Sequence, residues 1–384
     1  MRKIAHKALF IALAIAASSC AANAESKLDE IISSVKKEVA PDTRTTIWEI
    51  SSEKKGSEYI ITGKVDREQS KTELIKALDE SGVKYSAEIT ILPTGDKQWG
   101  IIDSSIASLR GDGKHSAELV TQALAGTPVK ILEEKGSWLR IQTPDNYISY
   151  SPASSVTELT EEELAAWKKS KRYIVTANST IITEEAKENS EVVSQVYLGT
   201  ILEEVPTTFA IKYIKVKFID NREGYIKKSD VEEFASWSEQ KYNPELINRT
   251  AHSMIGVPYL WGGFSTYAND CSGFAKLCYS ANGIILQRDA SQQALTGNII
   301  DASNWAKAEF GDLYFFGGTR VTHVAIHLQD GEYIHSNGSG QLKVNSVDPE
   351  SDIYTESKLL TISRIKDSIG TTGITTFKEH PWYF

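Results

Sequence analysis

The spacing of hydrophobic residues predicts a small α/β domain over residues 28–97. Apolar positions recur there first at helical spacing, then in two alternating runs, then at helical spacing again, and finally in one more alternating run. In chain order, the predicted elements are a helix over 28–35, strands over 45–50 and 59–65, a helix over 70–82 and a strand over 85–92. No residue pattern in this domain is typical of catalysis, so a spacer or packing role is expected.

An internal repeat follows. Residues 118–127 match residues 191–200, and each copy continues with alternating apolar residues and then an aromatic turn. Short strands joined by tight turns are typical of small β-barrels. We therefore predict two such barrels, at 98–157 and 171–236.

Two short helices are predicted to connect these parts. Thr160 begins a polar helix between the barrels, whose Leu164 and Trp167 are expected to pin the barrels together. After the second barrel, Asn243 and Pro244 begin another helix. That helix leads into a C-terminal domain predicted at 242–384.

The segment Asn269–Phe274 carries the strongest sign of chemistry. Asp270 is a good N-cap residue, the residues after it have helical apolar spacing, and Gly283 can end the helix. Cys271 then lies in the first turn, where unpaired N–H groups and the positive end of the helix dipole favour the nucleophilic thiolate. We therefore predict that Cys271 is a nucleophile rather than a buried filler.

Two strand-like runs downstream supply histidines for a nucleophilic cysteine. His323 and His335 follow Cys271 in the order of a triad in which His323 is the base and His335 orients it. His327 lies four strand residues, about 13 Å, from His323, too far to share a proton or a metal with it. His327 is expected to be a partly exposed face residue.

These motifs resemble those of the NlpC/P60 cysteine peptidases, which cut bacterial cell-wall peptides. The resemblance covers about residues 242–384, and its three signatures are Asp270–Phe274, His323–Ile326 and Tyr333–Ser336. Both barrels resemble bacterial SH3 domains, the second more weakly. The resemblance implies a multidomain α+β protein with a papain-like catalytic domain.

Relatives with two N-terminal SH3-like domains are similar to γ-D-glutamyl-L-diamino acid endopeptidases, which act on peptides released from peptidoglycan. In these, the first barrel walls the groove and selects a free N-terminal L-alanine. The resemblance implies that Asp270 and Ser272 bind the alanine amine, with Tyr259 beside them. From the first barrel it favours Tyr147, and less strongly Glu118, as substrate contacts.

Composition excludes several other classes. The formal net charge of −9 makes the chain a poor nucleic-acid binder. Its three cysteines, Cys20, Cys271 and Cys278, do not form a disulfide framework. Cys278 lies about 10 Å along the same predicted helix from Cys271 and is expected to be a buried apolar residue. No cofactor and no metal is expected, and the protein is expected to be a monomer.

Residues 1–24 resemble an export signal, with a basic start and an apolar run too short to span a membrane. Two cleavage modes stay open. Ala22–Ala24 fits a signal-peptidase site, whereas Ala17–Cys20 resembles a lipoprotein box with an unusual alanine at its first position. We expect a protein of the periplasm or cell envelope, with a possible lipid anchor at Cys20 and no transmembrane segment.

Three alternatives to an endopeptidase of peptidoglycan peptides stay open. An N-acetylmuramoyl-L-alanine amidase on a similar scaffold would use the same triad but would free the lactyl sugar. A wall-binding SH3 protein with an idle peptidase domain would sediment with insoluble wall. A zinc site made from the triad would make activity sensitive to a chelator.

Overall fold

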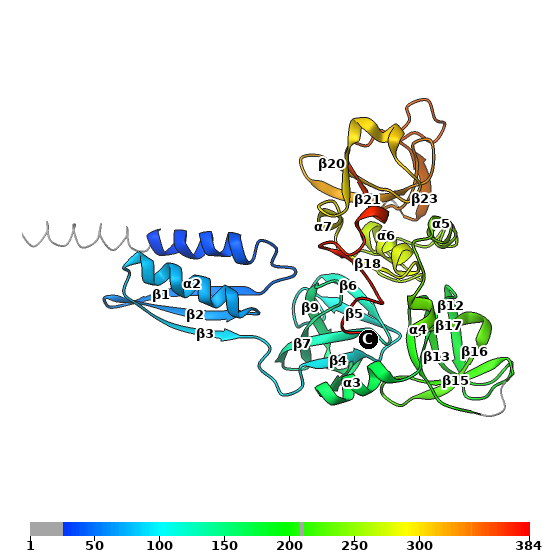
Figure 1. Ribbon diagram of the computed structural model, residues 1–384, viewed down its shortest axis with the longest axis horizontal. Coiled ribbons are helices and arrows are strands. Elements are labelled where there is room, and N and C mark those ends of the chain that lie inside the picture. Colours follow the sequence, from blue (N-terminus) through cyan, green and yellow to red (C-terminus); the bar gives the residue numbers. More distant parts are fainter. Residues whose placement is uncertain (1–25, 208–210, 339) are drawn as a thin grey trace, which may run out of the picture. The chain divides into compact units, whose positions relative to one another are not determined.

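The computed structural model describes residues 26–207, 211–338 and 340–384, which form two compact units divided between Thr94 and Gly95 (Figure 1). The predicted signal segment and Cys20 lie outside the described residues. Within the described ranges, no helix is both long enough and apolar enough to cross a membrane.

The first unit is a three-stranded sheet with helices. Its elements are a helix over 26–39, β1 (Trp48–Lys55), β2 (Glu58–Val65), α2 (Glu68–Ser81) and β3 (Tyr85–Ile91). β1 and β2 are antiparallel around a turn at Gly56, and α2 connects β2 to the parallel β3. Leu74 and Leu78 of α2 are fully buried in the core against the sheet. The predicted order of elements is confirmed, although β1 continues to Lys55 because it pairs with β2 up to the turn.

The second unit begins with two seven-stranded sheets of identical topology, as the internal repeat predicts. Their strand orders are β10-β4-β7-β8-β9-β5-β6 and β17-β11-β14-β15-β16-β12-β13. The first contains β4 (Trp99–Ile102), β5 (Ile106–Arg110), β6 (Leu119–Leu124), β7 (Pro128–Lys135), β8 (Trp138–Gln142), β9 (Ile148–Pro152) and β10 (Val156–Leu159). The second contains β11 (Arg172–Val175), β12 (Ser179–Thr183), β13 (Val192–Tyr197), β14 (Ile201–Glu204), β15 (Tyr213–Lys217), β16 (Glu223–Lys227) and β17 (Val231–Glu233). Each sheet encloses its own apolar core.

A helix and the C-terminal tail hold these sheets and the last domain together. α3 (Glu161–Lys169) has a capping box at Thr160, and it buries Leu164 and Trp167 as predicted. Both side chains join a core with α4 (Phe234–Ser238) and the C-terminal aromatic residues. Tyr383 is buried there. The tail therefore links the catalytic part of the chain to both sheets.

The C-terminal domain is a six-stranded antiparallel sheet packed against helices. The sheet order is β19-β24-β20-β21-β22-β23. Its elements are α5 (Pro244–His252), α6 (Cys271–Ser280), β18 (Ile284–Leu286), α7 (Ala290–Gln293), β19 (Asn298–Asp301), β20 (Leu313–Gly317), β21 (Val321–His327), β22 (Glu332–Ser336), β23 (Leu342–Ser346), β24 (Leu359–Arg364) and β25 (Ile374–Thr376). Every residue of α6 is buried, and the helix packs on β21. This packing places the first turn of α6 beside the strand that carries His323.

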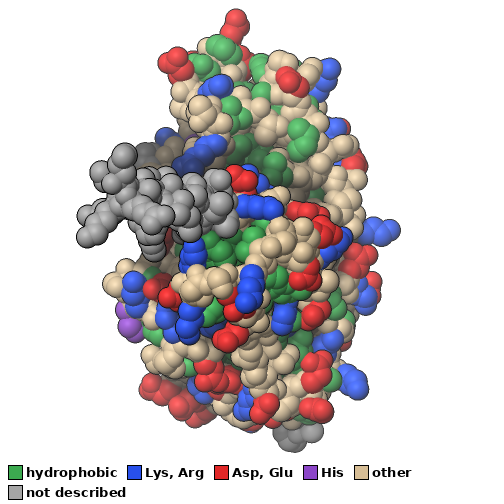
Figure 2. Space-filling model, turned by 90° about the vertical axis from the view of Figure 1, so that its left-hand side faces the viewer, with side chains coloured by type: hydrophobic (Ala, Val, Ile, Leu, Met, Phe, Trp, Pro, Cys, Tyr) green, Lys and Arg blue, Asp and Glu red, His purple; other side chains and the backbone are tan. Residues whose placement is uncertain are grey.

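Charged side chains of both signs are interspersed over the face drawn in Figure 2. That distribution agrees with the modest excess of acidic residues in the sequence. On this face no basic stripe of the kind that tracks a nucleic-acid backbone is visible.

Candidate active site

Cys271, the candidate nucleophile, lies where the helix was predicted to begin. Asp270 is the N-cap of α6, and its Oδ1 accepts a hydrogen bond from the Gly273 N–H at 2.7 Å. The N–H groups of Val324 and Ser272 donate hydrogen bonds to the Cys271 thiol. Because Val324 follows His323 in β21, the thiol lies at the strand that carries the predicted base.

The protonation state of Cys271 differs from the sequence-based expectation. Burial, followed by the neighbouring Asp270 charge, raises the pKa of the thiol to about 11. The two N–H donors and Arg288 act in the opposite direction but do not compensate. The prediction of a thiolate is therefore wrong for the unliganded protein, because Cys271 keeps its proton at neutral pH.

His323 begins a hydrogen-bonded chain across three neighbouring strands. Its Nε2 lies 2.6 Å from Nδ1 of His335, and Nε2 of His335 lies 3.0 Å from Oδ1 of Asn345. Asn345 donates its Nδ2–H to the Ile353 carbonyl at 3.2 Å, which fixes the amide oxygen toward His335. His335 therefore donates from Nε2 and accepts at Nδ1, so His323 carries its proton on Nε2. This tautomer leaves Nδ1 of His323 free of a proton and able to act as a base.

Both histidines of this chain are neutral at physiological pH. Burial, followed by the charge of His335, lowers the pKa of His323 to about 3. Burial and the nearby Lys343 lower the pKa of His335 to about 4, although its bond to Asn345 opposes the shift. A neutral thiol beside a neutral imidazole corresponds to general-base activation rather than a preformed ion pair.

Asn345 is a candidate positioning residue that the sequence analysis missed, because its side chain accepts a hydrogen bond from His335. Replacing Asn345 with Ala is expected to lower kcat/KM about tenfold, because the lost hydrogen bond is worth about 1 to 1.5 kcal/mol. Asn345→Asp would place a carboxylate beside His335 and move the acidic limb of the pH profile to higher pH. Asn298→Ala, at an exposed site of the same sheet, is the matched control. If Asn345→Ala and Asn298→Ala gave equal rates and the Asp variant an unchanged pH profile, the positioning role would be refuted.

His327 does not belong to this chain of hydrogen bonds. Only 3% of the residue is exposed, and its Nδ1 lies 3.0 Å from the Glu309 carbonyl oxygen. The expectation of a partly exposed residue is wrong, because the Glu309 segment and Tyr314 cover it. Both ring nitrogens of His335 are engaged by His323 and Asn345, and no metal-binding group of His, Cys, Asp and Glu occurs among the described residues.

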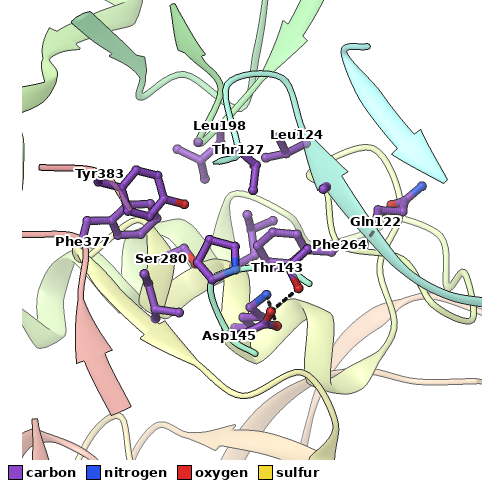
Figure 3. Close-up of a pocket in the computed structure, with 16 residues that line it drawn as sticks. Gln122, Leu124, Thr127, Thr143, Asp145, Leu198, Phe264, Ser280, Phe377 and Tyr383 are labelled. Atoms are coloured by element: carbon purple, nitrogen blue, oxygen red, sulfur yellow. Dashed lines mark hydrogen bonds and ion pairs between the residues drawn. The ribbon is translucent and has the colours of Figure 1, made fainter. Parts of the chain in front are cut away.

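The first seven-stranded sheet packs directly on the catalytic domain. A Cβ on Gly262 would lie 2.4 Å from the Leu119 carbonyl oxygen, so only glycine permits this approach. Lys276 of α6 forms a buried ion pair with Asp145 at 2.6 Å, and Thr143 donates to the same carboxylate (Figure 3). The cavity beside this pair is about 50 Å³ and is too small for a peptide. These contacts belong to a structural interface.

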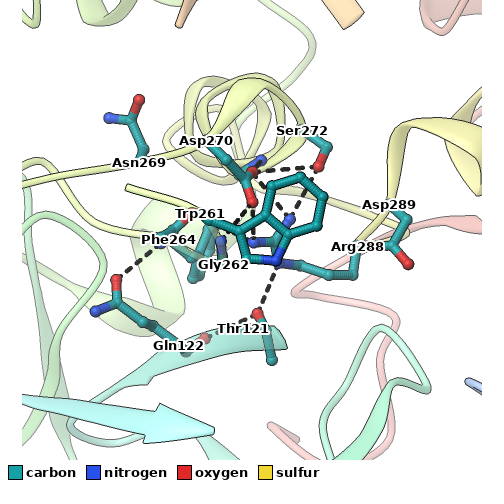
Figure 4. A network of polar contacts seen from close by, with 12 residues as sticks. Thr121, Gln122, Trp261, Gly262, Phe264, Asn269, Asp270, Ser272, Arg288 and Asp289 are labelled. Carbon is teal, nitrogen blue, oxygen red and sulfur yellow. Dashed lines mark hydrogen bonds and ion pairs between the residues drawn. The ribbon is translucent and has the colours of Figure 1, made fainter. Parts of the chain in front are cut away.

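A second buried ion pair joins Arg288 to Asp270, the residue before Cys271 (Figure 4). Arg288 is 1% exposed and donates to both carboxylate oxygens of Asp270, with distances of 2.7 and 3.1 Å. Its Nη1 also donates to Ser272 Oγ at 2.9 Å, and its Nε donates to Thr121 Oγ1 at 2.7 Å. Thr121 belongs to β6, so Arg288 connects the first sheet to the N-cap of the catalytic helix. The charge of Asp270 is thus already balanced before any substrate binds.

The other predicted binding residues have the following positions. Tyr259 is half-buried, and burial together with the Cys271 and Asp270 charges raises its pKa, so the phenol keeps its proton. The Tyr147 hydroxyl donates to Asp289 Oδ2 at 3.2 Å across the same interface.

Glu118 is exposed and accepts a hydrogen bond from the indole of Trp261 at 2.7 Å. Trp261 is 61% exposed. Its bond to Glu118 places it at the contact between the start of β6 and the turn before the catalytic helix.

Fold and site together define a papain-like cysteine peptidase with an appended pair of SH3-like domains. The NlpC/P60 family model matches residues 256–362, and a model described as bacterial dipeptidyl-peptidase Sh3 domain matches residues 109–156. Since curated relatives also match over most of their length, the chain belongs to the NlpC/P60 family of cysteine peptidases.

Two curated relatives illustrate the match. Dipeptidyl-peptidase 6 of Lysinibacillus sphaericus is 29% identical over 273 residues, which cover 69% of this chain and 97% of the relative. The γ-D-glutamyl-L-lysine dipeptidyl-peptidase of Bacillus cereus is 30% identical over 234 residues, which cover 57% of this chain and 67% of the relative.

Solved structures agree in fold. The crystal structure of an NlpC/P60 family protein from Bacillus cereus superimposes with a TM-score of 0.59 at 22% identity, over 69% of this chain and 99% of that one. An NlpC/P60 endopeptidase from Photobacterium damselae gives a TM-score of 0.52 at 18% identity and covers 75% of each chain.

Proposed function

We propose that this protein hydrolyses the bond between γ-D-glutamate and a diamino acid in peptidoglycan-derived peptides that have a free N-terminal L-alanine. The observation that carries the proposal is the Cys271 thiol at the N-terminus of α6, bonded to the Val324 N–H beside the His323–His335 pair. The relatives named for γ-D-glutamyl-L-lysine cleavage support the choice of bond.

The mechanism uses the neutral pair found in the unliganded protein. Nδ1 of His323 takes the proton of Cys271 as the sulfur attacks the peptide carbonyl and forms the C–S bond. N–H groups at the start of α6 and the Tyr259 hydroxyl stabilise the oxyanion. The imidazolium then protonates the leaving amine as the C–N bond breaks. Water hydrolyses the thioester, which frees the glutamate γ-carboxylate and the thiol.

A free ammonium in a walled groove needs an uncompensated negative charge. Asp270 was predicted to supply it, but Arg288 balances that carboxylate. Asp289 also acts on the Arg288 guanidinium, so the two carboxylates Asp270 and Asp289 around one guanidinium leave one net negative charge. We assign the ammonium to this group, and we give Ser272, Tyr259 and Tyr147, which donates to Asp289, supporting contacts. We assign Glu118 to the rim of this groove, because it accepts a hydrogen bond from the exposed Trp261.

The decisive experiment is mass spectrometry of L-Ala-γ-D-Glu-meso-diaminopimelate after incubation with the protein and with Cys271→Ala. The wild type is expected to release L-Ala-γ-D-Glu and free diaminopimelate, whereas Cys271→Ala should give no more product than buffer does. Cys278→Ala is the matched control, because Cys278 is a fully buried core residue two turns further along α6.

Three other outcomes would decide against the proposal or a part of it. Release of lactyl sugar from muramoyl peptides, without cleavage of the tripeptide, would identify an amidase. Absence of any cleavage, together with retention on insoluble wall, would identify a wall-binding protein. Equal cleavage of N-acetylated and free peptides would refute the requirement for a free alanine amine.

A further inference from the structure

A surface hollow of about 300 Å³ adjoins the two histidines of the site. His323 and His335 form part of its lining, and the other lining residues come from the ends of β20, β21 and β22 and from the segment 355–358. Its lining includes no residue of the two SH3-like domains among the described residues. The hollow is thus a separate space from the interface that Tyr147 and Trp261 occupy.

The proposed mechanism indicates which part of the substrate faces this hollow. The leaving amine must lie within hydrogen-bond reach of His323, which protonates it. The N-terminal end of the peptide is assigned to the side where the first SH3-like domain contacts Asp289 and the 258–264 turn. The diamino acid that carries the leaving amine therefore extends from His323 in the other direction, into the hollow.

The lining of the hollow carries one positively charged side chain. Lys358 is its one lining side chain with a permanent charge, and it is exposed. Its Nζ makes a long contact of 3.5 Å to the Gly318 carbonyl oxygen and forms no ion pair within the described part of the chain. Lys343, opposite His335 in the sheet, adds a second positive charge on this side of the site. Thr355 and Ser357 contribute hydroxyl groups to the lining.

We propose that this hollow binds a diamino acid whose side chain ends in a carboxylate as well as an amine, as in meso-diaminopimelate, and that Lys358 selects it over lysine. The side-chain carboxylate pairs with the Lys358 ammonium, whereas the bare ammonium of a lysine substrate meets a like charge. This inference rests on the proposed function and narrows its substrate class.

The test compares kcat/KM for L-Ala-γ-D-Glu-meso-diaminopimelate and for L-Ala-γ-D-Glu-L-Lys. Wild type should prefer the diaminopimelate peptide, and Lys358→Met should reduce that preference about two- to fivefold, as expected for an exposed ion pair. Lys358→Glu should reduce it further by attracting the lysine side chain, and Lys358→Arg should retain it. Lys228→Glu, an exposed lysine of the second SH3-like domain, is the control for the change in net charge.

The outcomes separate this inference from the proposed function. If wild type cleaves neither peptide, the proposed function itself fails. Two results would show an endopeptidase in which Lys358 does not recognise the side-chain carboxylate. One is cleavage of the two peptides by wild type at equal rates. The other is an equal reduction of both cleavage rates by Lys358→Glu. A peptide with a carboxamide at the side-chain terminus should behave like the lysine peptide.

Discussion

Arg288→Met is expected to lower the free energy of unfolding of the second unit by about 3–5 kcal/mol and to abolish most activity. The substitution would leave the Asp270 carboxylate buried without its counter-charge, and an uncompensated buried charge is among the most costly single defects. Because Asp270 also caps α6, the defect would act at the turn that holds Cys271. Urea unfolding measures the stability loss, and peptide hydrolysis measures the activity.

A double-mutant cycle identifies the cause. Asp270→Asn keeps an acceptor for the Gly273 N–H but removes the charge, so alone it should also destabilise, whereas Asp270→Asn with Arg288→Met should recover part of the loss. Arg222→Met, which breaks an exposed ion pair with Asp220, should cost less than about 1 kcal/mol. Equal effects of the two arginine substitutions, or additive effects in the cycle, would contradict a buried ion pair at this site.

Local signals in the sequence predicted the start of α6 and the repeat. An N-cap, a cysteine and helical apolar spacing lie within ten residues of each other, so α6 begins at Cys271 as expected. The repeat is likewise encoded locally, and the structure gives both copies the same strand order. Alternating runs also placed His323 and His335 on neighbouring strands, which brings their rings together across the sheet.

Contacts between distant segments could not be predicted in this way. Arg288 bonds to Asp270 and also to Thr121 of the first SH3-like domain, and nothing near Arg288 in the sequence indicates either contact. Asn345 is recognisable only once β22 and β23 are paired. The pKa of the Cys271 thiol is raised mainly by burial, which a sequence motif does not report.

His323→Ala is expected to lower kcat about 100- to 10,000-fold, the usual contribution of a positioned base. His252→Ala, at an exposed histidine of α5, should leave the rate unchanged.

The pH dependence of wild-type kcat/KM gives a sharper test of the base. His323 acts as a base when neutral, and with a pKa of about 3 it is protonated only under strongly acidic conditions, so kcat/KM should be flat from neutral pH down to about pH 4.

The same lowered pKa makes the fold sensitive to acid. The unfolded chain binds protons at its histidines below about pH 6.5, whereas His323 in the folded state does not, so stability should fall as the pH drops from about 6.5 toward 3. Circular dichroism at each pH separates this unfolding from protonation of the base.

Alkylation of Cys271 by iodoacetamide should be slow at pH 7 and should accelerate toward about pH 11, the pKa of the buried thiol. An alkylation rate that is already maximal at neutral pH would show a preformed thiolate and would replace general-base activation by an ion-pair mechanism.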